Sequence, residues 1–194
     1  MPKVVRVQAA GGPEVLKIEE LPLPQPGQGE LRLKVHAIGL NRAEVLFRMG
    51  MYMEPLNPPS RIGYDAVGVV DAVGPGVTNV KVGERVATVP NFAMGKYGVY
   101  GEYALVPAHS VAAYPDVLSS REAAAVWMSY LTVYGAFMLT ARIGKGDYVG
   151  RQRQLGLHRY PVLQARGRHL HRHHARTREK AGSAQCGQRS RGGD

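Results

Sequence analysis

The sequence is poor in cysteine: Cys186 is the only one in 194 residues. A single cysteine excludes an internal disulfide and any zinc site built from several cysteines. This scarcity is typical of a reducing compartment, so we expect a cytoplasmic protein. No run of 18 or more apolar residues occurs, and we therefore expect no membrane span. Residues 1–7 lack the long apolar segment of a signal peptide and instead predict a β-strand.

Most of the chain also lacks a charge excess of either sign. Residues 1–150 hold 14 Lys and Arg against 13 Asp and Glu, a net charge of +1. Residues 151–194 hold 11 basic and 2 acidic residues, a net charge of +9. The basic character therefore belongs to the last segment, which argues against specific nucleic-acid binding by the protein as a whole.

The stretch at residues 35–46 holds the first candidate for a functional residue. Residues 31–37 alternate between apolar and polar side chains, which predicts a half-buried strand. Gly39 ends this alternation, Asn41 follows, and residues 43–49 predict a helical turn. A polar side chain between a strand and a helix lies where ligands tend to bind. Asn also satisfies backbone groups in turns, so both interpretations of Asn41 stay open.

Short strands separated by turn residues follow one another over residues 1–118. We predict strands at residues 4–8, 16–21, 31–37, 62–74, 85–89, 100–107 and 110–114. The first two predict a hairpin, and residues 21–29 predict a proline-stiffened connector. The loop at 49–61 carries Tyr52, which either packs the loop down or forms a wall for an aromatic ligand. This succession predicts a mainly β, barrel-like antiparallel domain.

The pattern changes period at Ser119. Ser119 and Glu122 form a capping-box signature, which predicts a helix from Ser119 to Thr140. A turn at residues 144–147 then precedes a predicted buried strand that begins at Tyr148. We therefore divide the chain into a domain at 1–118, a connecting helix and strand at 119–149, and a basic segment at 150–194.

Four blocks in this order resemble a known family. They are residues 39–44 (GLNRAE), 63–70 (GYDAVGVV), 82–86 (VGERV) and 130–136 (YLTVYGA). Over about residues 1–149, the chain resembles the zinc-free quinone oxidoreductase branch of the medium-chain dehydrogenase/reductase superfamily. The resemblance implies a GroES-like, partly open β-barrel with a few helices. It also implies the start of an α/β Rossmann domain that binds NADPH and that is not completed here.

The resemblance also implies that the site holds no metal. Zinc-dependent relatives carry Cys where this chain has Asn41, His-Glu where it has Tyr64-Asp65, and a second Cys near Met128. Catalytic zinc needs three protein ligands from Cys, His or carboxylate side chains, which these positions do not supply. Residues 90–105 also lack the cysteines of the structural zinc lobe.

By resemblance, the activity is NADPH-dependent hydride transfer to a small aromatic quinone or a conjugated enone. Asn41 and Thr132 would contact the nicotinamide. Asn41, Tyr52 and Tyr64 are the catalytic candidates, and the two tyrosines would line the acceptor side. Thr132 has an equally good second interpretation, in which its hydroxyl bonds to the backbone of its own helix.

The resemblance stops after Val149. The family continues there with an apolar strand and a small Gly/Ser turn for the cofactor pyrophosphate, whereas residues 150–160 show neither. The composition of residues 150–194 predicts disorder. A frameshift is one explanation, because a one-base shift in C-rich codons would restore a family-like turn. Two weaker interpretations are a metal site at His169, His171, His173 and His174 and non-specific nucleic-acid binding by the arginines.

We therefore expect a reductase whose activity is impaired in this chain. The alternative is an inactive GroES-like domain that binds a small molecule or a protein partner, and a third hypothesis is a basic-tail nucleic-acid binder. Without a complete second domain, the helix at 119–140 exposes apolar residues, including Trp127, Leu131, Phe137 and Met138. Such a patch predicts poor solubility or a homodimer.

Overall fold

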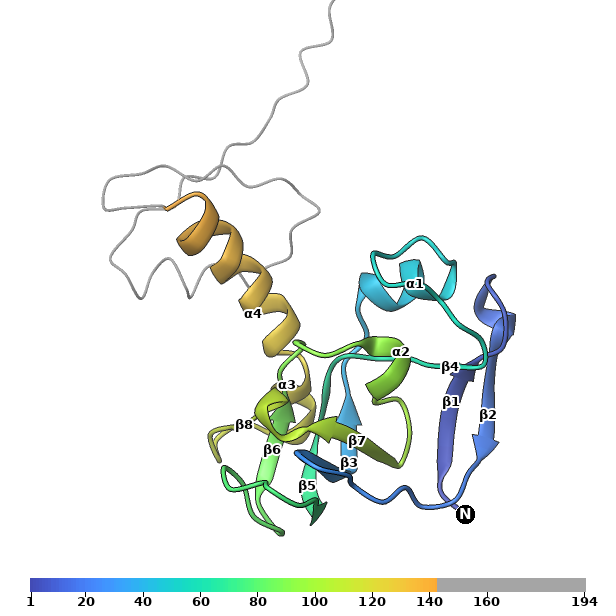
Figure 1. The fold of residues 1–194 in the computed structure, drawn as a ribbon. Coiled ribbons are helices and arrows are strands. Elements are labelled where there is room, and N and C mark those ends of the chain that lie inside the picture. The colour runs from blue at the N-terminus through green and yellow to red at the C-terminus, as the bar shows by residue number, and fades with distance from the viewer. Residues whose placement is uncertain (143–194) are drawn as a thin grey trace, which may run out of the picture.

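The computed structural model describes residues 1–142, which form a mainly β domain followed by helices (Figure 1). The predicted strand at Tyr148 and the basic segment 150–194 lie outside the described residues. The strands are β1 (Lys3–Val7), β2 (Leu16–Glu20), β3 (Glu30–Ile38), β4 (Ser60–Arg61), β5 (Ala66–Val73), β6 (Arg85–Thr88), β7 (Tyr103–Pro107) and β8 (Val111–Ala113). The helices and turns are η1 (Pro13–Val15), α1 (Arg42–Arg48), α2 (Met94–Tyr97), η2 (Ala108–Ser110), α3 (Ser120–Ala124), α4 (Trp127–Tyr134) and η3 (Gly135–Thr140).

The first sheet has three strands in the order β2-β1-β4. β1 and β2 form the predicted hairpin, with Lys3 opposite Glu20 and Val7 opposite Leu16. Val7 is fully buried, so one row of this sheet faces the core. No strand is found at residues 21–29, as expected for a proline-stiffened connector, and Arg32 binds this segment through the carbonyl of Pro24 at 2.9 Å.

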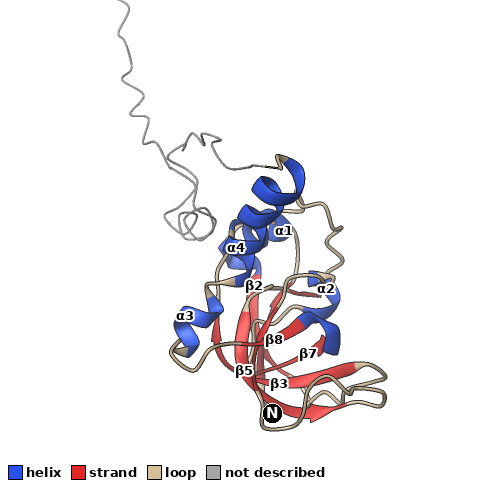
Figure 2. Ribbon diagram, turned by 90° about the vertical axis from the view of Figure 1, so that its left-hand side faces the viewer, coloured by secondary structure: helices blue, strands red, loops and turns tan. Residues whose placement is uncertain are grey.

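The second sheet has five strands in the order β7-β3-β5-β6-β8, and each neighbouring pair is antiparallel. The central strands bury Leu31, Leu33, Val67 and Val70 completely. Neither sheet closes on itself within residues 1–142, and the strands wrap around one core. The prediction of a mainly β, partly open barrel is confirmed. Figure 2 shows the strands gathered in one body with α1 and α4 above them.

One prediction in the middle of the chain was wrong, and one helical turn was missed. The predicted strand at 62–74 begins only at Ala66, because Gly63 adopts a left-handed φ of +103° and turns the chain. Sequence reasoning also missed α2, a single turn. Its first amides are capped by the carboxylate of Glu54, which lies 40 residues earlier and accepts from Met94 N at 2.8 Å.

The predicted helix at 119–140 is broken into pieces. Its capping box is present: Ser119 N donates to Glu122 Oε2 at 2.9 Å, and Glu122 N donates to Ser119 Oγ at 3.3 Å. α3 ends at Ala124 because Ala123 and Ala124 pack into a small core with Val67 and Ala87. α4 then leaves in a new direction, away from the sheets, and continues into η3 with π-type bonding (Figure 1).

Candidate functional site

Asn41 caps the helix that follows β3. Its backbone is extended, and its N–H donates to Glu44 Oε2 at 2.8 Å. Its side-chain Nδ2 donates to Glu44 Oε1 at 3.2 Å and to Asp65 Oδ2 at 3.1 Å. Both amide hydrogens of Asn41 are therefore used within the fold. This arrangement supports the capping interpretation of Asn41 and leaves its predicted role in catalysis a prediction.

Asp65 is a buried acid that sequence reasoning did not choose as a site residue. Asp65 is 3% exposed, and its Oδ1 has no hydrogen-bond partner among residues 1–142. The pKa of Asp65 is raised to about 6, mainly by burial; the hydrogen bond from Asn41 opposes this rise, and the nearby Glu44 carboxylate adds to it. The only sequence signal was its place beside Tyr64 in the block at 63–70.

Glu44 connects Asn41 with the segment that holds Tyr64 and Asp65. It is 5% exposed, and its Oε1 also accepts from the backbone N–H of Tyr64 at 3.2 Å. Thr88 holds the same segment from the other side, since its hydroxyl donates to Tyr64 O at 2.7 Å and accepts from Ala66 N at 2.8 Å. The backbone around Tyr64 and Asp65 is therefore fixed by side chains from α1 and β6.

Tyr52 and Tyr64 lie side by side, while their predicted role in lining the acceptor side stays a prediction. Their ring centroids are 6.3 Å apart in an edge-on arrangement, and Phe47 and Phe92 extend the row at either end. Tyr64 is only 7% exposed. Burial and a hydrogen bond with the Tyr52 side chain raise the pKa of Tyr64 well above its usual value. Tyr64 therefore keeps its proton at neutral pH and can act as a hydrogen-bond donor.

Thr132 lies on α4. Its hydroxyl donates to the carbonyl of Met128 at 2.6 Å, four residues earlier. This contact matches the helix-backbone interpretation of Thr132. Its side chain is nevertheless exposed, and the oxygen retains lone pairs for another donor.

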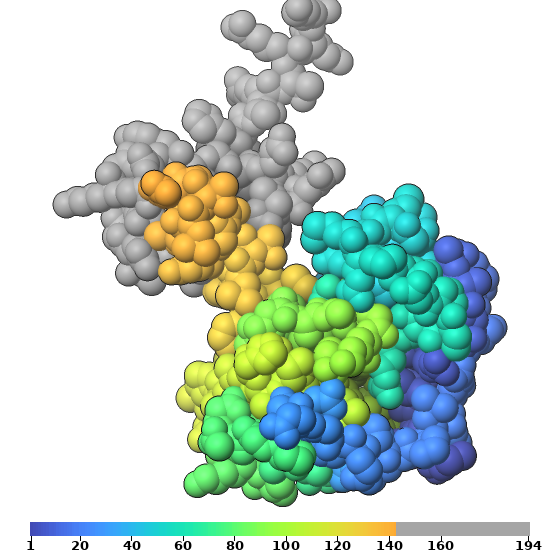
Figure 3. Space-filling model, in the orientation of Figure 1, coloured from blue at the N-terminus to red at the C-terminus, as the bar shows by residue number. Residues whose placement is uncertain are grey.

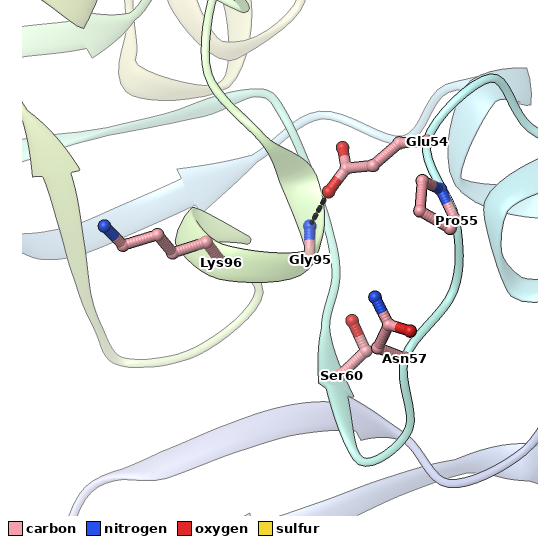
Figure 4. Close-up of a pocket in the computed structure, with 6 residues that line it drawn as sticks. All are labelled: Glu54, Pro55, Asn57, Ser60, Gly95 and Lys96. Atoms are coloured by element: carbon pink, nitrogen blue, oxygen red, sulfur yellow. Dashed lines mark hydrogen bonds between the residues drawn. The ribbon is translucent and has the colours of Figure 1, made fainter.

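A shallow hollow of about 290 Å³ lies elsewhere on the domain, between the loop before β4 and α2 (Figure 4). Its lining includes Glu54, Asn57, Ser60 and Lys96. Both oxygens of the Glu54 carboxylate are occupied by the amides of Met94 and Gly95. The hollow contains none of the predicted site residues, so we do not assign the chemistry to it.

The described part of the chain offers no ready metal site. Within residues 1–142, no three His, Cys, Asp or Glu side chains lie close enough to share an ion. The four histidines considered for a metal lie outside the described residues. In the same range, no helix is both long and apolar enough to cross a membrane.

Residues 27–116 match the sequence model of the alcohol dehydrogenase GroES-like domain. Quinone oxidoreductase from Homo sapiens is 35% identical over 169 residues, covering 85% of this chain and 50% of the relative. A mycobacterial protein solved in complex with NADPH has a TM-score of 0.76 and 33% identity, over 88% of this chain and 52% of that one. Escherichia coli quinone oxidoreductase complexed with NADPH has a TM-score of 0.74 and 28% identity, covering 87% of this chain and 51% of that one.

These matches confirm the resemblance to quinone oxidoreductases and the GroES-like fold. The chain spans about half the length of the curated relatives it matches.

Proposed function

Because this chain carries an alcohol dehydrogenase GroES-like domain and is a homologue of quinone oxidoreductases, we propose that it provides the catalytic domain of an NADPH-dependent reductase. The acceptor is a quinone or a conjugated enone. The match of residues 27–116 to that domain is the observation that carries the proposal. The boundaries 1–118, 119–149 and 150–194 are part of it, as are a cytoplasmic location and the absence of a membrane partner.

The reaction does not use zinc in this proposal. Positions 41, 64 and 128 hold Asn, Tyr and Met, which do not form a catalytic zinc site. Conjugated carbonyl acceptors accept hydride without the strong Lewis acid that alcohol oxidation requires. The side chains then need only orient the acceptor and stabilise charge on its oxygen.

Tyr52 and Tyr64 take this role. Negative charge develops on the acceptor's carbonyl oxygen when hydride arrives, and a tyrosine hydroxyl can donate a hydrogen bond to it. The raised pKa of Tyr64 keeps that donor protonated. The surrounding rings of Phe47 and Phe92 exclude water, which strengthens such a hydrogen bond.

NADPH, when bound, supplies the hydride. In the described residues only its nicotinamide end has candidate partners: the exposed Thr132 oxygen can accept from the carboxamide, and Asn41 lies at the β3–α1 turn. The family places the diphosphate site in an apolar strand and a small Gly/Ser turn after Val149, and the sequence of residues 150–160 shows neither. We therefore propose that the activity of this chain is weak.

The test uses the full chain, NADPH and a simple benzoquinone, with NADPH oxidation followed by absorbance. Tyr64→Phe is expected to lower kcat about tenfold or more, because it removes one donor to the developing charge. Tyr103→Phe, on β7 and without a side-chain hydrogen bond in the described structure, is the matched control and should leave the rate unchanged. A chelator should also leave it unchanged. Loss of activity with the chelator would refute the zinc-free mechanism.

The second candidate function is an inactive binding module. It is favoured by the internal hydrogen bonds of Asn41, which use both hydrogens of a side-chain amide that a cofactor would need. The binding-module hypothesis predicts that the quinone affinity measured by calorimetry is the same with and without NADPH. It also predicts that no NADPH is oxidised. Steady NADPH oxidation at rates typical of enzymes would exclude it.

A further inference from the structure

Three basic side chains form a row across the three-stranded sheet. Arg6 on β1 lies directly opposite Lys17 on β2 and directly opposite Arg61 on β4. Directly opposite residues of antiparallel strands project from the same face, with Cβ atoms about 5 Å apart. The next row pairs Val7 with Leu16 and Ser60, and its Val7 and Ser60 are buried. The row of cations therefore lies on the outer face.

The acidic residues near this row do not balance it. Arg6 Nη1 forms an ion pair with Glu19 Oε2 at 3.1 Å, and Arg6 Nη2 donates to Pro59 O at 2.6 Å. Glu19 also accepts from the Gln8 side chain. Within residues 1–142, the side chains of Lys17 and Arg61 form neither a hydrogen bond nor an ion pair, although both residues belong to β-strands and the Arg61 carbonyl accepts from Ser60 Oγ. Three positive charges thus face one negative charge.

Arg61 is the member of the row that most needs a partner. Its side chain is half-buried. Burial and the charge of Arg6 both lower its pKa, although a guanidinium stays charged at neutral pH. Like charges at directly opposite positions destabilise a sheet, and a partly desolvated cation without a partner adds to that cost.

We propose that Arg61 and Arg6, with Lys17 beside them, bind a small soluble phosphate group. A guanidinium donates two parallel hydrogen bonds to phosphate oxygens, and no side-chain donor of Arg61 is used by another group within the described residues. The excess of two positive charges matches a phosphate dianion better than a carboxylate. Three strands at about 4.8 Å spacing make the row about 10 Å wide, which suits one phosphate group. The site is distinct from the Asn41–Tyr64 region and does not rest on the proposed reductase activity.

The experiment titrates the full chain with inorganic phosphate by calorimetry, in about 0.1 M chloride so that long-range attraction is screened. Saturable binding to one site is expected. Arg61→Gln should weaken it about tenfold or more, and Arg61→Lys by less, because the charge remains while the two-pronged contact is lost. Arg121→Gln is the matched control, because Arg121 is exposed on α3 and the substitution removes the same single positive charge. This variant should bind phosphate as tightly as the parent does.

Lys17→Gln protects the test against misfolding, because Lys17 is exposed and unpaired in the described structure. It should weaken binding about threefold, as loss of one exposed charge does. The proposal is overturned if phosphate does not saturate, or if Arg61→Gln and Arg121→Gln weaken binding equally. Binding to phosphatidic-acid vesicles without binding to inorganic phosphate would also overturn it and assign the face to a membrane surface.

Discussion

The carboxylate of Asp65 accepts a hydrogen bond from the carboxamide of Asn41, with 3.1 Å between Oδ2 and Nδ2. The same carboxamide nitrogen donates to Glu44, so one amide group bridges two buried acids. A buried carboxylate is stable only where donors surround it, and Asn41 supplies donors to both. Activity measurements on Asn41 variants therefore need a stability measurement beside them.

Thr88 offers a direct test of how the Tyr64 segment is held. Thr88→Val keeps the shape but leaves Ala66 N–H and Tyr64 C=O without their partner in a buried place. We expect the free energy of unfolding to fall by about 3 kcal/mol, since each buried unpaired group costs about 1–3 kcal/mol. Urea denaturation measures this. Thr88→Ser retains the hydroxyl and should lose only about 1 kcal/mol for the missing methyl. Equal losses for the two variants would contradict the argument.

Gly68 on β5 lies against the backbone of β3, where it pairs with Val35. A Cβ on Gly68 would lie 1.9 Å from the carbonyl oxygen of Lys34, which is backbone and cannot swing away. We expect Gly68→Ala to lower the free energy of unfolding by about 3 kcal/mol or more. Gly135 is the matched control, because a Cβ there meets no atom within 4 Å and its backbone is helical. Gly135→Ala should instead stabilise the chain by about 0.5–1 kcal/mol.

Local signals in the sequence predicted the strands and the helix start. The alternation at 31–37 marked β3, and the pair of Ser119 and Glu122 marked the first turn of α3. Each signal involves residues close together in the chain, whose spacing alone fixes their faces or their hydrogen bonds.

Contacts between distant residues could not be predicted. α2 depends on Glu54, 40 residues earlier, and the buried state of Asp65 depends on Asn41 and Glu44. The helix at 119–140 has an unbroken helical composition, yet packing of Ala123 and Ala124 against β5 and β6 redirects the chain. Tyr52 stands out in the sequence as an aromatic residue in the loop at 49–61 and Tyr64 through the family resemblance, and only the fold brings their rings together.

The C-terminal helices should promote self-association. Leu131 is 37% exposed and Leu139 is 67% exposed. They belong to α4 and η3, the orange segment that projects from the β body in Figure 3. Exposed apolar side chains of this kind favour contact with a second copy. We expect Leu139→Gln to lower the dimer fraction in sedimentation experiments. Val117→Gln is the control, because Val117 is 87% exposed but lies before these helices. A monomeric parent at high concentration would contradict the prediction.

Asp65 should make the stability of the fold depend on pH. Its pKa is raised from 3.8 to about 6 in the folded state. Between these values the folded chain keeps a proton that the unfolded chain has lost, so the free energy of unfolding falls as pH rises. Well above pH 6, the loss in the free energy of unfolding caused by the raised pKa of Asp65 is constant at about 3 kcal/mol. Asp65→Asn has no such proton, and its amide oxygen can still accept from Asn41. We expect this variant to be more stable than the parent at pH 8, with the difference shrinking towards pH 4.

Urea denaturation between pH 4 and pH 8 measures this difference. Asp116→Asn is the matched control, because Asp116 is almost fully exposed and its pairing with Arg85 at 2.8 Å is a surface ion pair. Such a pair contributes little, so the control should follow the parent curve closely. If the free energy of unfolding of Asp65→Asn runs parallel to that of the parent across this pH range, ionisation of the buried Asp65 does not destabilise the fold. If the stability curves of the parent and of Asp65→Asn converge at low pH, the fold accommodates the buried Asp65 in its protonated form.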